Sequence, residues 1–269
     1  MSRPPRSRSP LAKRHFGQHF LAHPEQARSI VETFAPAAAD RIVEIGPGRG
    51  ALTLDLAARA GRFVALEIDD DLIADLSPRL ESLPHAEVRA GDAKSVDWDA
   101  LAAQLGGPLR IIGNLPYNVA TPIVRGLLGA TNVVDALVML QLEVADRLLA
   151  REGSKAYGPL SIIAALRARG RRVRVLAPSC FRPRPKVHSA LVQLIFIEAP
   201  PLAAERIGWL ESWIFRGFAH RRKTVGNNLA PWRPRVERWL AEQGLPIDVR
   251  AEAIAPPDWL RLAESLEGR

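Results

Sequence analysis

Residues 114–117 (Asn-Leu-Pro-Tyr) are the part of the chain whose residue types best suit chemistry on an amine attached to a flat ring. The lone pair of such an amine is conjugated into the ring, so an enzyme that alkylates the amine must hold its hydrogens with acceptors. The side-chain oxygen of Asn114 and the carbonyl of Leu115 are two acceptors, and Pro116 restricts Leu115 to extended conformations. Tyr117 offers an aromatic face for a planar base. The motif therefore predicts a site for an aromatic amine.

A second candidate site is the glycine-rich turn at residues 46–50, which follows an apolar run expected to be a strand. Gly46 and Gly48 allow a tight turn and the close approach of a ligand to the backbone. Their spacing differs from the dinucleotide-binding motif, and no lysine follows as in a phosphate-binding loop. Roughly twenty residues further on, Glu67 ends the next predicted strand, where a carboxylate can bind both hydroxyls of a ribose.

A third candidate is Asp92, which follows another predicted strand at the edge where ligands of parallel sheets bind. Its carboxylate could accept from an adenine amine, and the next backbone amide could donate to the ring. Alone, an Asp at this position is more often an ordinary helix cap. In order with the glycine turn, Glu67 and Asn114, it favours a nucleoside site.

An alternation of strands and helices is predicted to position these residues. Short, nearly continuous apolar runs predict parallel strands at 41–45, 63–68, 87–90, 109–113 and 133–140. Helices are expected at 24–35, 51–60, 70–80, 98–105 and 120–129. Helical sequence continues over 144–169, and residues 172–176 and 189–197 are expected to finish the sheet as a two-stranded hairpin. The pattern predicts a Rossmann-like, doubly wound α/β fold.

The character of the chain changes near residue 200. Beyond it, residues 203–218, 223–229, 235–243 and 258–266 are predicted to be helical. Five of the six tryptophans lie here and could anchor a small core: Trp209, Trp213, Trp232, Trp239 and Trp259. We therefore predict a basic disordered arm at 1–14, a Rossmann-like domain at 15–199 and a small all-α domain at 200–269.

Positive charge is concentrated in three stretches without Asp or Glu, at residues 1–24, 153–197 and 216–235, within a formal net charge of +8. Clustering on this scale is typical of proteins that bind a polyanion, and we expect RNA. The residues expected to contact RNA are Arg182, Arg184, Lys186, Arg221, Arg222 and Lys223.

Composition restricts the setting. The one cysteine, Cys180, allows neither an intramolecular disulfide nor a cysteine-based zinc site. No apolar run approaches the roughly 20 residues of a membrane span, and the basic N-terminus lacks the apolar core of a secretory signal. His15, His19 and His23 recur at helical spacing, but Gly17 argues against a helix there. We expect a cytoplasmic protein without a metal.

These motifs, in this order, resemble those of the adenine dimethyltransferases that modify small-subunit ribosomal RNA, relatives of the macrolide-resistance methylases of large-subunit RNA. The likeness covers the chain after the basic arm and includes residues 16–21, 154–158, 181–189 and 221–224. The chain departs from the family pattern at His19, where the family usually has Asn, and at Gly226, near which a basic residue is common.

The resemblance implies S-adenosylmethionine as the methyl donor. It implies that residues 18–21 fold over the donor, that the glycine turn lies near its methionine part, and that Asp92 lies at its adenine. The donor-binding residues would be Gln18, His19, Leu21, Gly46, Gly48, Glu67, Ile68, Asp92, Ala93 and Asn114.

The same resemblance implies the reaction. Two adjacent adenosines near the 3′ end of 16S ribosomal RNA would be dimethylated at N6, in the precursor of the small ribosomal subunit, by a monomer. The nitrogen would attack the methyl group directly, and Tyr117 and Phe181 would sandwich the flipped base. The catalytic residues would be Asn114, Leu115, Tyr117 and Phe181.

The sequence was also compared with what other functions would require. DNA adenine methylases usually carry an acidic residue or paired prolines where Asn114 to Tyr117 stand, and a protein-amide methylase would not explain the basic clusters. Cytosine carbon methylation needs a nucleophilic cysteine, and Cys180 is in the wrong segment. Large-subunit RNA is an alternative substrate. A protein of another class, an assembly factor that binds ribosomal RNA and whose methylation is incidental, is the remaining alternative.

Overall fold

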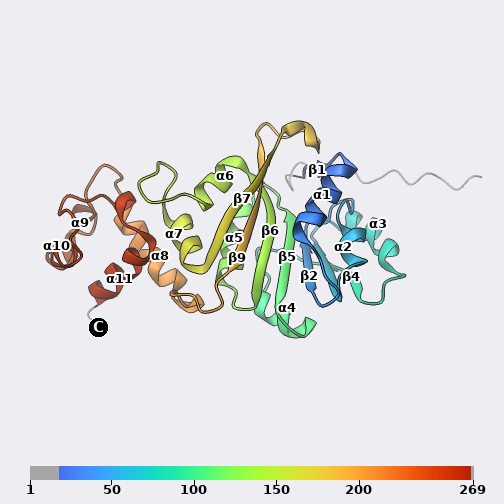
Figure 1. Ribbon diagram of the computed structural model, residues 1–269, viewed down its shortest axis with the longest axis horizontal. Helices are drawn as coiled ribbons and strands as arrows, with labels where there is room; N and C mark the ends of the chain where they lie inside the picture. Colours follow the sequence, from blue (N-terminus) through green and yellow to red (C-terminus); the bar gives the residue numbers. More distant parts are fainter. Residues whose placement is uncertain (1–17, 268–269) are drawn as a thin grey trace, which may run out of the picture. The chain divides into compact units, whose positions relative to one another are not determined.

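The computed structural model describes residues 18–267, so the predicted arm at 1–14 lies outside the described residues. The chain divides into two compact units. The first runs to Leu142 and includes Arg172–Gln193, and the second holds Glu143–Arg171 and Leu194–Arg269 (Figure 1). This division follows contacts between residues, and the predicted domain boundary at residues 199–200 stays a prediction.

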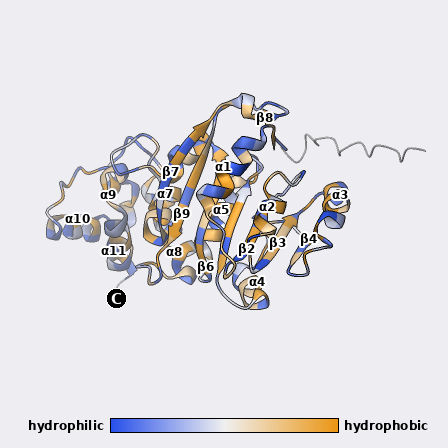
Figure 2. Cartoon of the chain, turned by 45° about the vertical axis from the view of Figure 1, so that its right-hand side comes forward, coloured by the Kyte–Doolittle hydropathy of each residue, from blue (hydrophilic) through white to orange (hydrophobic). Residues whose placement is uncertain are grey.

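A seven-stranded sheet has the strand order β4-β3-β2-β5-β6-β9-β7. The strands from β2 to β6 pair in parallel, as predicted. Their side chains are largely apolar because helices cover the sheet, and Figure 2 shows this as orange along the central strands. The bounds are β2 (Arg41–Ile45), β3 (Arg62–Glu67), β4 (Ala86–Ala90), β5 (Leu109–Asn114), β6 (Val133–Gln141), β7 (Ala168–Leu176) and β9 (Ser189–Phe196).

The order of the strands makes the sheet doubly wound. From β2 the chain proceeds outward to β3 and β4, then returns to β5 on the other side of β2. Right-handed crossovers therefore place the helices after β2 and β3 on one face and those after β4 and β5 on the other. The helices are α1 (Pro24–Phe34), α2 (Thr53–Ala57), α3 (Asp70–Leu80), α4 (Trp98–Leu105) and α5 (Ala120–Gly129). The predicted fold class is confirmed.

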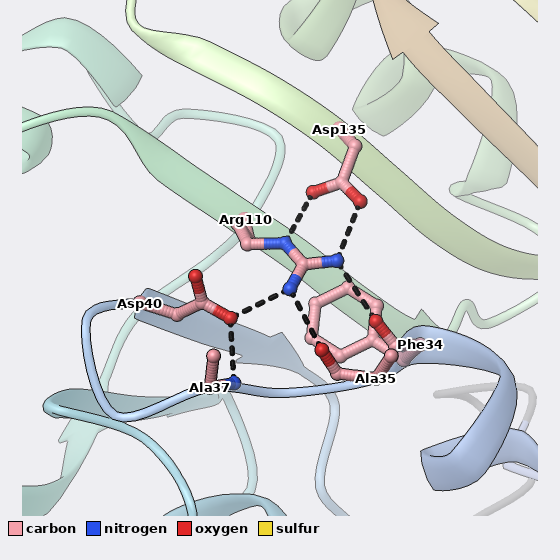
Figure 3. Close-up of polar contacts among 6 residues, drawn as sticks. All are labelled: Phe34, Ala35, Ala37, Asp40, Arg110 and Asp135. Carbon is pink, nitrogen blue, oxygen red and sulfur yellow. Dashed lines mark hydrogen bonds and ion pairs between the residues drawn. The ribbon is translucent and has the colours of Figure 1, made fainter.

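Arg110, near the start of β5, ties together the amino-terminal edge of this sheet (Figure 3). Its guanidinium donates through Nε and Nη2 to both carboxylate oxygens of Asp135, at 2.9 and 2.8 Å, and through Nη1 to Asp40 at 2.6 Å. It also donates to the last carbonyls of α1, those of Phe34 and Ala35, and lies 4.4 Å from the Phe34 ring centroid. The hydrogen bonds to Asp135 and Asp40 raise the pKa of Arg110.

The second unit is built mainly from helices around buried tryptophans. Trp213, Trp239 and Trp259 are buried, and Trp259 lies 5.6 Å from the ring of Phe218, so three of the five tryptophans predicted to anchor this core lie in it. Trp209 and Trp232 are half-buried. The helices that contribute residues to this unit are α6 (Leu142–Leu148), α7 (Pro159–Arg167), α8 (Ile207–Gly217), α9 (Val225–Asn228), α10 (Arg233–Glu242) and α11 (Pro256–Glu267).

The expected helical run at 144–169 is wrong in its middle and at its end. Residues 149–158 form a loop, and β7 begins at Ala168. Gly153 has a φ of +79°, which glycine adopts at little cost, and its amide donates to Glu252 at 2.6 Å. Pro159 starts the next helix because its fixed φ suits the first turn.

Within residues 18–267, the structure contains no helix with the length and apolar character needed to cross a membrane.

Candidate active site

A cavity of about 230 Å³ lies at the carboxyl ends of the parallel strands, within the first unit. This edge, where the strand order reverses between β2 and β5, is where ligands of doubly wound sheets bind. The cavity brings together most of the residues predicted from sequence. Of these, it is lined by Gln18, His19, Gly46, Gly48, Glu67, Ile68, Asp92, Ala93, Asn114, Leu115 and Tyr117.

The glycine turn between β2 and α2 forms one wall of the cavity. Gly46 and Gly48 have φ values of +63° and +56°, which strain any residue with a side chain. A Cβ on Gly48 would lie 2.8 Å from the ring of Phe20, so glycine is also required sterically. The turn therefore presents bare backbone to the cavity.

Glu67, the last residue of β3, is buried and held by the backbone. One carboxylate oxygen accepts from the amide of Gly48 at 3.1 Å, and the other accepts from those of Ile68 and Asp69 at 2.9 and 3.1 Å. Burial raises the pKa of Glu67, and these hydrogen bonds oppose the rise. The carboxylate of Glu67 thus joins the end of β3 to the glycine turn that follows β2.

Asp69 is a site residue that the sequence analysis did not single out. It caps α3 by accepting from the amide of Asp71, and its second oxygen accepts from the side chain of Gln18 at 3.1 Å. The segment that begins at Gln18 is therefore fixed to the end of β3. An Asp directly before a predicted helix was the available signal, but a cap alone does not predict a distant partner.

Glu44 is the second residue that sequence reasoning passed over. It lies in β2, fully buried, and accepts from the hydroxyl of Thr53 at 2.7 Å, so the pair joins the two sides of the glycine turn. Burial raises the pKa of Glu44 to about 8, the Thr53 bond opposes this, and the charge of Glu67 adds to it. Its signal in sequence was a carboxylate within an otherwise apolar run.

Asp92 lines the cavity from the loop after β4. Its carboxylate accepts from the amide of Lys94 at 3.0 Å and lies 3.1 Å from the ammonium group of the same lysine. Both side chains remain partly exposed, which leaves Asp92 accessible to a ligand. Ala93 is buried beside it, whereas Ile68 is an exposed apolar side chain at the cavity.

The residues from Asn114 to Tyr117 line the cavity from the end of β5, the strand next to β2. The amide nitrogen of Asn114 donates to the carbonyl of His19 at 2.6 Å, which fixes the orientation of the side chain. No described residue donates to its amide oxygen, which therefore stays an available acceptor. The hydroxyl of Tyr117 lies 2.6 Å from that of Ser189, and burial raises the pKa of Tyr117.

A short two-stranded sheet joins the segment that begins at Gln18, which lines the cavity, to a motif distant in sequence. β1 (Phe20–Leu21) pairs antiparallel with β8 (Phe181–Arg182). The amide of Ala22 donates to Cys180, and the imidazole of His19 lies 2.7 Å from the carbonyl of Pro183. The segment predicted to cover the donor is therefore attached to the basic loop that follows Phe181.

Two predicted site residues do not line the cavity. Phe181 is fully buried in the apolar core, where its neighbours include residues of α1 and the central strands. Leu21 packs against the same core. The predicted stacking role of Phe181 stays a prediction, and its burial in the core does not support that role.

The predicted RNA-binding residues are exposed but belong to separate units. In the first unit, Arg182 is the exposed last residue of β8, and Arg184 and Lys186 are exposed in the loop that follows. In the second unit, the turn before α9 exposes its three basic residues, and the first of them lies 3.5 Å from the carboxylate of Glu252. These three are Arg221, Arg222 and Lys223.

No group of three or more His, Cys, Asp or Glu side chains suited to a metal ion occurs among the described residues; His15 is outside that range.

Comparison with known proteins identifies the family to which the chain belongs. The model of the family described as ribosomal RNA adenine dimethylase matches residues 10–267. A protein of Variovorax paradoxus named ribosomal RNA small subunit methyltransferase A is 37% identical, covering 96% of this chain and 98% of the relative. A protein of Acidithiobacillus ferrooxidans with the same name is 41% identical, covering 95% of each chain.

Two solved structures share the fold over nearly the whole chain. The 23S rRNA methyltransferase ErmE has a TM-score of 0.72 and 27% identity, and the match covers 92% of this chain and 99% of ErmE. A dimethyladenosine transferase from Plasmodium falciparum has a TM-score of 0.74 and 24% identity, with 91% and 96% covered.

Proposed function

Because this chain belongs to the ribosomal RNA adenine dimethylase family, we propose that it dimethylates N6 of two adjacent adenosines near the 3′ end of small-subunit ribosomal RNA. The donor is S-adenosylmethionine, and the reaction accompanies assembly of the small subunit. We further propose that the enzyme acts as a monomer in the cytoplasm.

One observation carries the proposal: a single cavity contains both the groups suited to a nucleoside cofactor and the groups suited to an aromatic amine. Glu67 and Asp92 come from the ends of β3 and β4, whereas Asn114 ends β5. A methyl transfer without a covalent enzyme intermediate requires that donor and acceptor meet in one place.

The residues at the cavity fit S-adenosylmethionine. The turn at Gly46 and Gly48 offers backbone that a Cβ would obstruct, the Glu67 carboxylate can accept from ribose hydroxyls, and Asp92 can accept from an adenine amine. When bound, the cofactor supplies a methyl group on a positively charged sulfur. The backbone segment that begins at Gln18 would cover it, because this segment is tied to Asp69 and Asn114.

Asn114 and Leu115 would hold the hydrogens of the target amine. The bond from the Asn114 amide nitrogen to His19 directs the amide oxygen away from that partner, so the oxygen can accept from the substrate. Tyr117 would support the flipped adenine, and its ring is fixed at the hydroxyl end by Ser189. Orientation supplies most of the rate enhancement, because the attacked nitrogen becomes acidic only after it gains the methyl group.

The identity of the RNA follows from the relatives and from charge. The relatives that are 37–41% identical over about nine-tenths or more of both chains carry a small-subunit name, which favours that subunit over large-subunit RNA. Two exposed basic groups could bind its phosphates, one in each unit. The second group belongs to the predicted all-α domain at 200–269.

Transfer of labelled methyl groups tests the proposal. Purified protein and labelled S-adenosylmethionine would be incubated with under-methylated small subunits and, in parallel, with large subunits. We expect label in two neighbouring adenosines near the 3′ end of the small-subunit RNA, each carrying two methyl groups. Label confined to large-subunit RNA, or found on another base, would refute the assignment.

A further inference from the structure

His19 contacts the motif at residues 114–117 at two points and the loop after β8 at a third. Its imidazole Nδ1 lies 2.7 Å from the carbonyl oxygen of Pro183, and its ring centroid lies 5.1 Å from that of Tyr117, with 32° between the ring planes. Its own carbonyl accepts from the amide nitrogen of Asn114 at 2.6 Å. One residue therefore joins the segment over the donor site, the motif for the target amine and the loop after β8.

The chemistry of these contacts fixes the imidazole. A carbonyl oxygen can only accept, so Nδ1 of His19 carries a hydrogen and donates it to Pro183. The ring is then held beside Tyr117 at a defined tilt. The hydroxyl of Tyr117 is bonded to Ser189, which is fully buried, so the phenol ring is restrained at both its face and its hydroxyl.

We propose that the imidazole of His19 is a positioning residue for the target adenine, which acts by holding Tyr117 and the loop at Pro183 in the arrangement that receives the base. This inference rests on the proposed function, and it assigns the side chain of His19 to the RNA side of the cavity rather than to the donor. The residues next to Pro183 are the exposed Arg182 and Arg184. RNA phosphates bound by Arg182 and Arg184 would therefore influence the position of the base through the hydrogen bond between His19 and Pro183.

The two side-chain contacts of His19 can be separated by substitution. His19→Asn places an amide donor near the position of Nδ1 but removes the ring beside Tyr117. His19→Phe keeps a ring and removes the donor to Pro183. We expect each variant to lower kcat about fivefold, and His19→Ala to lower it about twentyfold, since an aromatic pair and a neutral hydrogen bond have effects of this order.

The readouts distinguish positioning from damage to the fold or to the donor site. Dissociation constants for S-adenosylmethionine, and for under-methylated small subunits without donor, should stay within about twofold of wild type, because most RNA affinity comes from phosphate contacts. His23→Asn and His23→Phe are matched controls: His23 is exposed, contacts Glu25 and does not line the cavity, so wild-type kcat is expected.

Unchanged kcat in all three His19 variants, or a loss explained by weaker donor binding, would overturn the inference. If wild-type protein fails to methylate small subunits, the proposed function fails instead, so the two failures are distinguishable.

Discussion

The two ends of strand β5 use polar residues in opposite ways. At its start, Arg110 directs all three nitrogens of its guanidinium at acceptors of the chain, and the side chains of this network are 13–19% exposed. At its end, Asn114 uses its amide nitrogen for one bond to His19, and no described residue donates to its oxygen. The first end is satisfied internally, whereas the second keeps an acceptor for a ligand.

This difference indicates which polar groups serve stability and which serve function. A guanidinium that is largely removed from water is costly unless every hydrogen finds an acceptor, and the chain supplies them at the amino edge of the sheet. An amide oxygen to which no described residue donates is tolerated at the carboxyl edge because Asn114 lines a cavity. Substitutions at the two ends of β5, at Glu44 and at the basic turn before α9 test this contrast.

Asn114→Ala should lower kcat about a hundredfold, because the oriented acceptor for the target amine is lost. The free energy of unfolding and the affinity for S-adenosylmethionine should change little. Turnover on under-methylated small subunits, with donor binding measured separately, provides the check. Wild-type turnover in this variant would show that the amide oxygen of Asn114 has no role in methyl transfer.

Arg110→Met should lower the free energy of unfolding by about 3 kcal/mol, because it leaves two carboxylates and two helix carbonyls without their donor. Turnover per folded molecule should match wild type. Arg89→Met is the matched control: Arg89 pairs with Glu87 on the surface, so a loss below about 1 kcal/mol is expected. Urea denaturation would measure both, and equal losses would contradict a special role for the Arg110 network.

Glu44→Gln should make stability depend less on pH. Unlike Asp40 and Asp135, Glu44 is bonded to a hydroxyl rather than to Arg110, and its pKa is raised from 4.5 to about 8. Between these values the unfolded chain loses a proton that the folded chain keeps, so stability falls as pH rises. The substitution should remove up to about 1.4 kcal/mol per pH unit from that slope.

Denaturation of both proteins across this pH range would measure the change, and identical slopes would mean that Glu44 is ionised in the folded protein.

Neutralising Arg221, Arg222 and Lys223 together should reduce the salt dependence of small-subunit binding. Each lost phosphate contact lowers the slope of log K against log salt by about 0.7 to 0.9, so the three should lower it by about 2. A variant with Arg28, Arg59 and Arg62 neutralised removes the same charge from exposed positions of the first unit and should keep the slope. An equal change of the salt slope in both variants would mean that RNA binding depends on net charge and not on the position of these three residues.

The local pattern of the sequence predicted most of the fold. The parallel strands and several helices, α3 and α5 among them, lie where apolar runs and periodicity placed them, because burial on both faces of a sheet is a local signal. The sequence did not predict the break between α6 and α7. Gly153 favours a turn and Pro159 favours a helix start, but the residues around them are good helix formers.

The site was predictable where a residue ends a strand and not where it depends on a distant contact. Glu67, Asp92 and Asn114 meet at one cavity because the carboxyl ends of parallel strands share an edge. The bond between Gln18 and Asp69 spans 51 positions in sequence, and spacing does not predict it. Phe181 shows the converse, since its charged, proline-rich neighbours gave no sign that its ring is in the core.

A crystal structure of the protein bound to S-adenosylmethionine would show where the donor lies. We expect the ribose at Glu67, the adenine at Asp92, and the methyl group toward the oxygen of Asn114. A donor bound away from the residues at 114–117 would contradict this expectation.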